Sequence, residues 1–496
     1  MNIPGYISRN KFFVLITLMC IVSRIPELLS PDLVLDGDEC VVAIMAKHIM
    51  KGQAFSPFFY GQAYGFSLIE CLFIIPFYFI FGITTLAVKL GMLTLWATGV
   101  LFLYQAFLHI NKSHKWLPLL FILIFIWSPA WAAWSMKARG GYLTAFTLAS
   151  IVLCLLFREK KSYAVTVFAG ILVVLIYQSK SIWIPGLVPF IIFFLMKNKK
   201  HLLAFITPVL LLSIAAWFYK QSMLEFGVYE VDYSLANLWP RICRIPAFLY
   251  CSLHGNYYLS AVLKPNVFCA VQALGFAVLT FALPLIAVYN IITRKKETLL
   301  FNLSACSIAL TLLLTIFTES IKGRFLLPIT GYVLFSFLLW LNTVTISKKI
   351  LYSTASNYIA MGIVSLITFY NFSFLPVREK PLKTAISYLE NKGIHYAYCT
   401  DNMFTWQVIF YSNEQVICHE RRLPGRFPKY AWQVDSAYYG GAKAAYIAQP
   451  GFPSEINFPR SEMVGDCYIA TDPPKEMISK EFPRQNTRPD YYYCKY

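Results

Sequence analysis

Long apolar stretches recur along the chain from residue 12 to residue 370. A helix needs about 20 apolar residues to cross a bilayer, and the pattern predicts eleven such spans. They are 12–29, 84–108, 117–134, 142–157, 163–179, 183–196, 202–219, 267–291, 299–317, 326–342 and 351–370. A further stretch, 66–82, is shorter and contains Glu70 and Pro76. The pattern predicts a polytopic α-helical membrane protein, in which the behaviour of 66–82 decides the orientation of every later span.

Basic clusters between the spans indicate that orientation. They are Arg9/Lys11, Lys112/Lys115, Arg158/Lys160/Lys161, Lys197/Lys199/Lys200, Arg294/Lys295/Lys296 and Lys348/Lys349. Loops rich in Lys and Arg remain in the cytosol, and all six clusters do so only if 66–82 does not cross. We therefore expect 66–82 to be a re-entrant or juxtamembrane helix, the N-terminus to be cytosolic and the C-terminus to lie outside. No small-residue cleavage site follows the first span, so we expect it to be retained.

After residue 370 the pattern becomes that of a soluble domain. It predicts a helix at 383–391 and strands at 394–399, 415–418 and 444–448. We expect two domains: a transmembrane domain, 1–370, with its first outer loop at 30–65, and a small extracytoplasmic α/β domain, 371–496. The first predicted strand is not followed by a glycine-rich phosphate loop, so the sequence predicts no nucleotide site.

Composition excludes several classes of protein. The chain is 58% hydrophobic and 14% charged, with a net charge of +18, whereas soluble domains carry about 25% charged residues. A nucleic-acid-binding protein would be basic but not this apolar, so the expected partner is the lipid bilayer and not a nucleic acid. The basic clusters account for +13 of the net charge, so most of the excess reports orientation.

The twelve cysteines show no C-x-x-C spacing, which argues against a zinc cluster or a thioredoxin-like site. Cys399, Cys418, Cys467 and Cys494 belong to the expected outer domain. Disulfides are allowed in that compartment, but the spacing of these residues does not set a pairing.

Three acidic residues fall within four positions of the first outer loop: Asp36, Asp38 and Glu39. The segment that follows, 40–50, has the pattern of an amphipathic helix, so one interpretation is that an acid caps its N-terminus. Three acids exceed what a cap needs, and charge is costly at the membrane surface. The alternative is a site carboxylate that abstracts a proton or binds a metal.

The same loop contains the run Tyr60-Gly-Gln-Ala-Tyr-Gly65. Tyr60, Gln62 and Tyr64 combine aromatic rings with an amide, as suits contact with a sugar or a lipid headgroup. The alternative for either tyrosine is a place in the interfacial aromatic belt.

Several cations fall on the outer side despite the orientation rule. Those closest to turns between spans are Lys137, Arg139, Lys180, Lys322 and Arg324, and the long outer loop 220–266 adds Arg241, Arg244 and His254. A lysine at a span end can extend its ammonium to water, which is one interpretation of Lys180. The alternative for Lys180, and the expectation for Lys137, is contact with the substrate. Arg139 and Arg324 lie in glycine-containing turns, where an anionic substrate group such as a phosphate is the natural partner.

These motifs resemble the GT-C superfamily of integral-membrane glycosyltransferases, in particular bacterial relatives of the protein O-mannosyltransferases and the aminoarabinose transferases. The resemblance rests on Asp36-Gly-Asp38-Glu39 with its amphipathic helix, on 59–66, and on Arg324-Phe-Leu-Leu-Pro328. It implies a GT-C-type fold, a polyprenyl-phosphate sugar donor, inversion at the anomeric carbon and a first-loop Asp as base. Asp38, directly followed by Glu, matches that base, with Asp36 as the second choice.

Some members of the superfamily hold a metal between carboxylates of the first and second outer loops. Here the second outer loop offers Lys137 and Arg139 and no acid, so we expect no metal and no other cofactor.

The resulting expectation is a membrane glycosyltransferase at the outer face of the cytoplasmic membrane. It would move a sugar from a polyprenyl-phosphate donor to a hydroxyl of a glycan, lipid or protein acceptor. Asp38 would act as base, with Asp36 or Glu39 orienting the acceptor and Arg139 and Arg324 holding the phosphate. One alternative is a transporter or flippase, which favours broken or charged helices at mid-membrane. Another is a polymerase or ligase of lipid-linked glycans, which would lack the early acidic motif.

Overall fold

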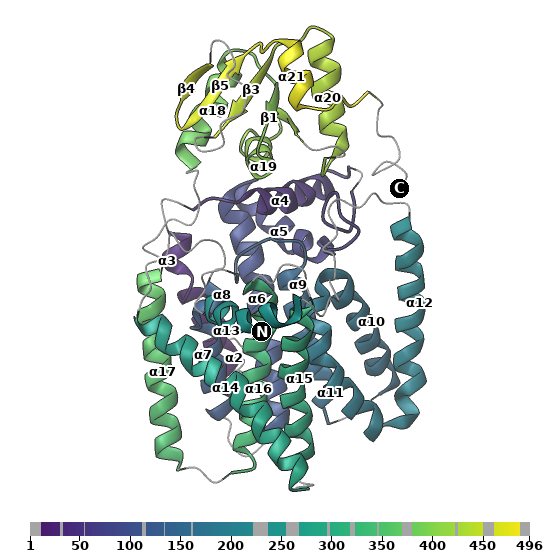
Figure 1. Cartoon of the computed structure of the whole chain (residues 1–496), viewed down its shortest axis with the longest axis vertical. Coiled ribbons are helices and arrows are strands. Elements are labelled where there is room, and N and C mark those ends of the chain that lie inside the picture. The colour runs from purple at the N-terminus through teal and green to yellow at the C-terminus, as the bar shows by residue number, and fades with distance from the viewer. Residues whose placement is uncertain are drawn as a thin grey trace, which may run out of the picture.

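The apolar stretches of the sequence form helices in the computed structural model of the chain (Figure 1). The structure describes residues 11–29, 33–53, 55–111, 116–132, 134–159, 162–221, 237–253, 267–294, 298–317, 323–344, 347–369, 379–421, 425–449 and 461–486. Outside these ranges lie seven of the fifteen residues of the predicted basic clusters (Arg9, Lys112, Lys115, Lys160, Lys161, Lys295 and Lys296). Lys322, His254, Cys494 and the predicted domain boundary at 370/371 lie outside them as well.

Helices account for nearly all of the described chain up to residue 369. In the first half they are α2 (Lys11–Val22), α3 (Ile25–Leu28), α4 (Gly37–Met50), α5 (Leu68–Phe81), α6 (Thr85–Ile110), α7 (Trp116–Ile126), α8 (Pro129–Ala132), α9 (Tyr142–Phe157), α10 (Tyr163–Lys180), η1 (Ser181–Trp183), α11 (Ile184–Lys197), η2 (Lys199–His201) and α12 (Leu202–Gln221). They continue as α13 (Leu238–Leu253), α14 (Val267–Ile292), α15 (Leu299–Ile316), η5 (Gly323–Leu326), α16 (Leu327–Leu341) and α17 (Lys348–Phe369).

Six helical segments of the described chain are long and apolar enough to cross a membrane: Thr85–Ile110, Tyr163–Lys197, Lys199–Lys220, Ala270–Ile292, Leu299–Ile316 and Arg324–Leu341. The segment from Tyr163 to Lys197 is two helices, as predicted. Both Tyr163, at its start, and Phe194, near its end, pack on His201 (ring centroids 4.6 and 6.1 Å). The chain therefore reverses at η1, and α10 and α11 are antiparallel.

Some predicted spans are interrupted or misplaced. The stretch predicted at 12–29 breaks after α2, and the one at 117–134 breaks between α7 and α8, next to Pro129. The predicted outer loop 220–266 contains α13, whose amphipathic face buries Arg241 and Leu249. A helix with one polar face has no long apolar run, so hydropathy alone missed it.

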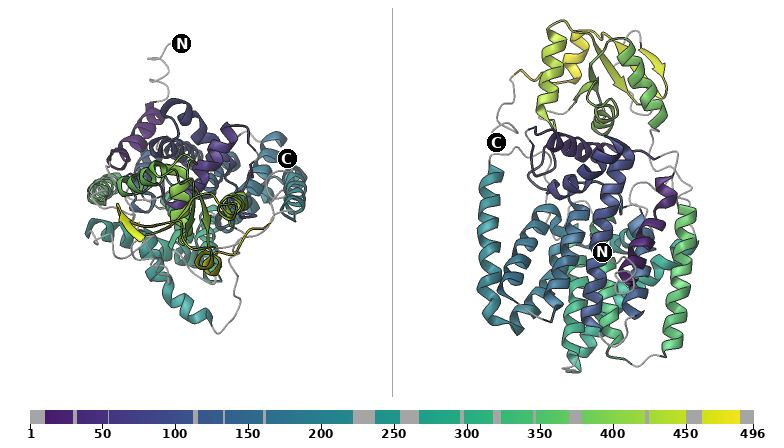
Figure 2. Two further views of the ribbon diagram at one scale, coloured as in Figure 1. Left: turned by 90° about the horizontal axis from the view of Figure 1, so that it is seen from above. Right: turned by 180° about the vertical axis from the view of Figure 1, so that it is seen from behind.

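Helix α5 forms from the stretch 66–82, which the charge pattern predicts not to cross the membrane. It does not run the length of the bundle. Its first turn lies beside α9, where the backbone N–H of Gly141 donates to Glu70 Oε1 (2.8 Å). Its other end lies beside α4, where Tyr78 Oη donates to the carbonyl of Ala43 (3.0 Å). Thr85, just beyond, meets Tyr411 of the α/β part (3.0 Å). Both ends of α5 are therefore at one end of the bundle, which we call the α4 end (Figures 1 and 2).

The opposite end of the bundle gathers the predicted cytosolic turns. Asn342 Nδ2 donates to the carbonyl of Ile110 (3.2 Å), joining the ends of α16 and α6. Thr166 Oγ1 and His201 Nδ1 lie 2.8 Å apart, joining the start of α10 to η2. The basic turns thus meet at one end and the acidic motif lies at the other, as the charge pattern predicts.

Residues 379–486 form an α/β unit above the α4 end. Its five-stranded sheet has the order β2-β1-β3-β5-β4, with β1 (Tyr396–Cys399) parallel to β2 (Ile417–Glu420) and β3 (Ala444–Ala448), and β5 (Cys467–Thr471) antiparallel to β3 and β4 (Ser461–Val464). The helices are α18 (Glu379–Asn391), α19 (Asn402–Tyr411), α20 (Pro428–Tyr439) and α21 (Lys475–Glu481). The first helix and three strands were predicted; β4, β5 and the other helices were not. Cys399, Cys418 and Cys467 are buried and free.

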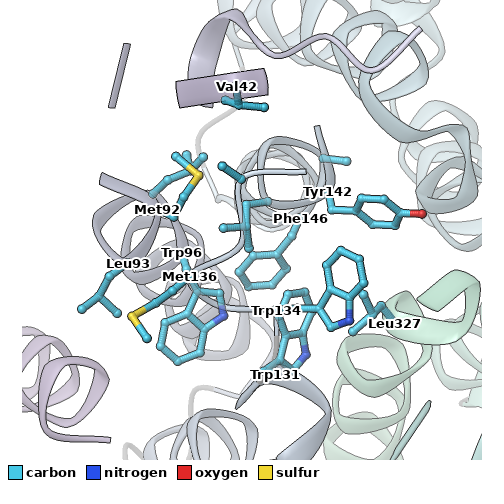
Figure 3. Packing of buried hydrophobic residues seen from close by; sticks show 14 of the residues in the cluster. Val42, Met92, Leu93, Trp96, Trp131, Trp134, Met136, Tyr142, Phe146 and Leu327 are labelled. Carbon is cyan, nitrogen blue, oxygen red and sulfur yellow. The ribbon is translucent and has the colours of Figure 1, made fainter. Parts of the chain in front are cut away.

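Aromatic side chains fill the core of the bundle below α4. The rings of Trp131 and Phe146 lie 4.6 Å apart, and Trp131 Nε1 donates to Thr330 Oγ1 (2.9 Å) on α16. Trp134 packs on Tyr142 at 4.6 Å. Figure 3 shows these rings converging with side chains of α6 and α16. This packing fixes the segment 134–142, which carries two of the predicted site cations.

Candidate functional site at the N-terminus of α4

The acidic motif begins with a helix cap. Asp36 Oδ1 accepts the backbone N–H of Glu39 (3.0 Å), and Glu39 Oε2 accepts the backbone N–H of Asp36 (3.1 Å). This reciprocal capping box provides acceptors for two backbone N–H groups that have no partner within the helix. The capping interpretation of the sequence is therefore confirmed for Asp36, with Glu39 as its partner.

The same two acids are buried against three cations. Asp36 Oδ2 accepts from Lys137 Nζ (2.9 Å) and from the Arg139 guanidinium (2.9 and 3.2 Å). Glu39 Oε1 accepts from Lys89 Nζ on α6 (2.7 Å). Asp36 is 4% exposed and Glu39 is 0% exposed. These carboxylates hold α4, α6 and the 134–141 turn together.

Electrostatics reinforce this arrangement. Burial acts to raise the pKa of Asp36, but Arg139 and Lys137 outweigh it and hold that pKa well below its usual range. Burial acts to lower the pKa of Lys137, while Asp36 and Glu39 raise it further, and the net shift is upward. Asp36 and Lys137 therefore both remain charged near neutral pH.

Asp38 has different surroundings. Its side chain takes no part in the capping box and is 21% exposed. Its Oδ2 lies 3.6 Å from Arg139 and its Oδ1 accepts from Arg426 (3.0 Å). Of the three acids of the motif, Asp38 alone has substantial exposure and lies between two guanidiniums.

Arg426 comes from the α/β unit and was not identified from the sequence. Its guanidinium also lies over the ring of Phe59 (4.8 Å). Its backbone passes so close to Gly61 that a Cβ on Gly61 would lie 2.8 Å from the Arg426 Cα. Gly61 has φ +72°, a conformation that glycine tolerates best. Nothing local to Arg426 indicates this role, because 388 residues separate it from Asp38.

A second group of cations surrounds Tyr142, the first residue of α9. Lys180 Nζ lies 4.6 Å from the centre of its ring and the Arg324 guanidinium 6.0 Å from it. Lys180 also lies 5.0 Å from the ring of Tyr64. Arg139, three residues before Tyr142, lies 3.6 Å from Asp38. The structure therefore brings four predicted residues, Lys180, Arg324, Tyr64 and Arg139, into one region with Asp38.

Two consecutive glycines make this convergence possible. Gly140 and Gly141 have φ +57° and +93°. A Cβ on Gly140 would meet the Phe59 ring at 3.0 Å, and one on Gly141 would meet Ser179 at 3.0 Å. Larger residues would push the 59–65 loop and the end of α10 away from Arg139 and Tyr142.

Tyr60 lies differently from what a direct substrate contact requires, whereas the contact predicted for Gln62 stays a prediction. Tyr60 is fully buried; its hydroxyl lies 2.8 Å from His48 Nδ1, and its ring stacks on Phe427 of the α/β unit (4.8 Å, 17°). Gln62 is half-buried in the turn, where its backbone N–H donates to Phe59 (3.0 Å). Tyr60 thus joins α4 to the α/β unit.

The acidic motif does not suit a divalent metal ion. The carboxylate oxygens of Asp36 and Glu39 already accept hydrogen bonds from lysine, arginine and backbone donors. Asp38 faces two guanidiniums, whose positive charge opposes a metal ion. Within the described ranges, no group of three His, Cys, Asp or Glu side chains is placed to share a metal ion. We therefore derive no chemistry through a metal.

The comparisons with known proteins find matches among solved structures. No protein-family model matches the sequence, and no curated protein matches it. Among solved structures, ArnT from Cupriavidus metallidurans bound to undecaprenyl phosphate matches with TM-score 0.58 and 10% identity, over 94% of this chain and 98% of that one. The oligosaccharyltransferase of Archaeoglobus fulgidus, in its apo form, matches with TM-score 0.51 and 9% identity, over 88% and 69%.

Both proteins are GT-C glycosyltransferases. The resemblance predicted from the motifs is therefore confirmed at the level of the fold.

Proposed function

We propose that this chain is a glycosyltransferase that moves a sugar from a polyprenyl-phosphate donor to an acceptor hydroxyl, with Asp38 as the general base. The observation that carries the proposal is the division of labour in the acidic motif. All three acids contact cations, but Asp36 and Glu39 are buried, whereas Asp38 is partly exposed between Arg139 and Arg426. A base must reach its substrate, and Asp38 is the acid of the motif that can do so.

The proposed reaction is a single displacement. The acceptor hydroxyl gives its proton to Asp38 while its oxygen bonds to C1 of the donor sugar. The bond between C1 and the phosphate oxygen breaks, and the electron pair leaves with the polyprenyl phosphate. Attack from the face opposite the leaving group inverts the anomeric carbon.

Arg139, Lys180 and Arg324 are placed to hold the phosphate. Negative charge grows on the leaving oxygen as the bond breaks, and fixed cations stabilise that charge. The three cations lie on the same side of the bundle as Asp38, two of them against the ring of Tyr142. The structural match to ArnT bound to undecaprenyl phosphate supports a donor of this class.

We further propose that the protein spans the cytoplasmic membrane eleven times, with residues 1–370 as its membrane domain. The N-terminus would be cytosolic, and the domain 371–496 would lie outside beside the α4 end. The separation of basic turns from the acidic motif supports this orientation.

Asp38→Asn tests the proposed base. It keeps the side-chain shape and removes the proton acceptor, so we expect transfer to fall by at least a hundredfold, in line with the usual contribution of a positioned base. The assay follows radiolabelled sugar from membrane lipid to acceptor. Asp466→Asn, the same change at an exposed carboxylate of the α/β unit, should retain full transfer.

Full activity of a well-expressed Asp38→Asn protein would refute the assignment. A defect in moving lipid-linked glycan across the membrane, with transfer intact, would support the transporter alternative instead.

A further inference from the structure

A cavity of about 490 Å³ lies between the C-terminal end of α4 and the α/β unit. We propose that it binds an anionic saccharide, a sugar that carries a carboxylate or a phosphate. Under the proposed function this saccharide belongs to the acceptor; that assignment rests on the proposed function, whereas the binding itself does not.

A network of polar side chains builds the inner wall of the cavity. Glu414, in the turn after α19, meets Lys47 Nζ (2.5 Å) with one carboxylate oxygen. Its other oxygen meets His48 Nε2 (3.1 Å) and accepts from Tyr430 Oη (2.5 Å). Lys47 is 2% and His48 3% exposed. The single carboxylate of the wall is therefore fully engaged and does not repel an incoming anion.

The turn that carries Glu414 adopts an unusual backbone. Asn413 and Glu414 have φ +52° and +65°, a region in which a side chain such as Glu is rare. Such conformations persist where surrounding contacts hold them, and they cluster at functional sites. Lys47 provides such contacts, since its Nζ also donates to the carbonyl of Asn413 (2.9 Å). The wall is thus organised before any ligand arrives.

The opening of the cavity is positively charged. Lys51, just after α4, and Lys429, in the first turn of α20, line the cavity and are exposed. Neither forms an ion pair with any residue that the structure describes. Together with Lys47 they set three ammonium groups against one carboxylate, which favours a ligand with negative charge.

The remaining lining suits a sugar better than a bare anion. Phe427 and Tyr430 contribute aromatic rings set at 70° and 4.8 Å. Gln53, Gln415 and Gln433 contribute amides, which can pair with hydroxyl groups. The volume lies within the range of about 300–1,000 Å³ that is usual for small-molecule sites.

The chain connects this cavity directly to the candidate base. Arg426 reaches Asp38, and the next residue, Phe427, lines the cavity. Helix α4 makes the same connection, since Asp38 lies in its first turn and Lys47 in its last. The cavity is therefore placed to hold one part of a larger acceptor whose hydroxyl lies near Asp38.

A binding measurement on the full chain in neutral detergent tests the proposal, with trigalacturonate as the anionic probe and maltotriose as the neutral one. We expect trigalacturonate to bind at least tenfold more tightly. Lys51→Glu combined with Lys429→Glu should weaken the binding of trigalacturonate at least tenfold, because it reverses the charge at the opening of the cavity. Both lysines are exposed, so their replacement leaves the inner wall intact. Lys480→Glu, on an exposed position of α21 outside the cavity, is the matched control and should change nothing.

Equal binding of the two probes, or an equal loss in the Lys480→Glu protein, would overturn the proposal. Displacement of trigalacturonate by equimolar inorganic phosphate would show a simple anion site and contradict the proposal. Competition by phosphatidylglycerol in mixed micelles with the same detergent would assign the cavity to a lipid headgroup and contradict it as well. Asp38→Asn should bind trigalacturonate normally. If Asp38→Asn binds trigalacturonate but does not transfer sugar, the result supports the proposed binding site. If Asp38→Asn still transfers sugar, the result refutes Asp38 as the base and leaves the binding site unaffected.

Discussion

Asp36 and Asp38 are two positions apart and have opposite surroundings. Asp36 closes the capping box and forms ion pairs with Lys137 and Arg139 inside the protein, whereas Asp38 is partly exposed. The sequence correctly pointed to the motif but could not tell these acids apart. Their difference is set by Lys137, Arg139 and Arg426, which are distant in the sequence.

Asp36→Asn should therefore act on stability. The change leaves two buried cations without their main counter-charge, and breaking a buried ion pair costs about 3–5 kcal/mol. We expect a clearly lower unfolding temperature in detergent, measured by tryptophan fluorescence. Asp38→Asn is the control and should shift it little; similar unfolding temperatures for the two variants would contradict the division of roles.

Tyr142 provides a second test at this scale. Its ring contacts Lys180 and Arg324, and a cation–π contact contributes about 0.5–2 kcal/mol. Tyr142→Leu should raise the KM for the lipid donor roughly fivefold or more, because the two cations lose their common support. Tyr142→Phe keeps the ring and should retain most of the affinity; equal defects in both variants would point to the hydroxyl instead.

At the scale of elements, α4 packs on α19 of the α/β unit as well as on the bundle. Gly37, at its start, packs so closely on α19 that a Cβ would lie 2.3 Å from the carbonyl oxygen of Met403. Leu35, two residues before α4, donates its backbone N–H to Tyr411 of the α/β unit. Lys47, in the last turn of α4, donates to the carbonyl of Asn413. The α/β unit therefore holds the acidic motif in place from above.

The Glu414 network makes this docking sensitive to acid. Burial acts to raise the pKa of Glu414, but contacts with His48, Lys47 and Tyr430 lower it to about 2. A carboxyl whose pKa falls on folding stabilises the folded state above its unfolded pKa and loses that effect as the pH drops towards its folded pKa.

Glu414→Gln should thus destabilise the protein by about 3 kcal/mol at pH 6, and the difference should vanish between about pH 4.5 and pH 2. Unfolding midpoints measured across this range check the prediction. Glu462→Gln, at an exposed carboxylate, should show no such convergence. A constant difference between wild type and Glu414→Gln across the range would contradict the assigned shift.

The pattern of apolar and polar positions predicted the long apolar spans, the amphipathic helices α4 and α18 and the first three strands, and it missed α13 and β4. The long spans form unbroken apolar runs although much of their surface is not buried within the protein, and β3 forms one because all of its residues are buried. Helix α13 was missed because only one face is apolar, and β4 because its residues are largely exposed. The interpretation of 66–82 as a helix that does not cross came from charge, and the placement of α5 agrees with it.

At the scale of the whole molecule, charge separation makes a topological prediction. A reporter inserted at Asn198, between α11 and α12, should be cytosolic, and one at Gly441 of the α/β unit should be extracytoplasmic. The basic turns and the acidic motif lie at opposite ends of the bundle, so the two signals must differ. Reporters on the same side of the membrane would contradict the proposed orientation.

The pairing of Asp38 with Arg426 also has a consequence for biogenesis. The two residues are 388 positions apart, so a ribosome that adds about 5–20 residues per second reaches the second roughly 20–80 s after the first. During that interval the growing polypeptide already carries its acidic motif but not the arginine that covers it. No truncated product that ends before residue 426 contains the complete site.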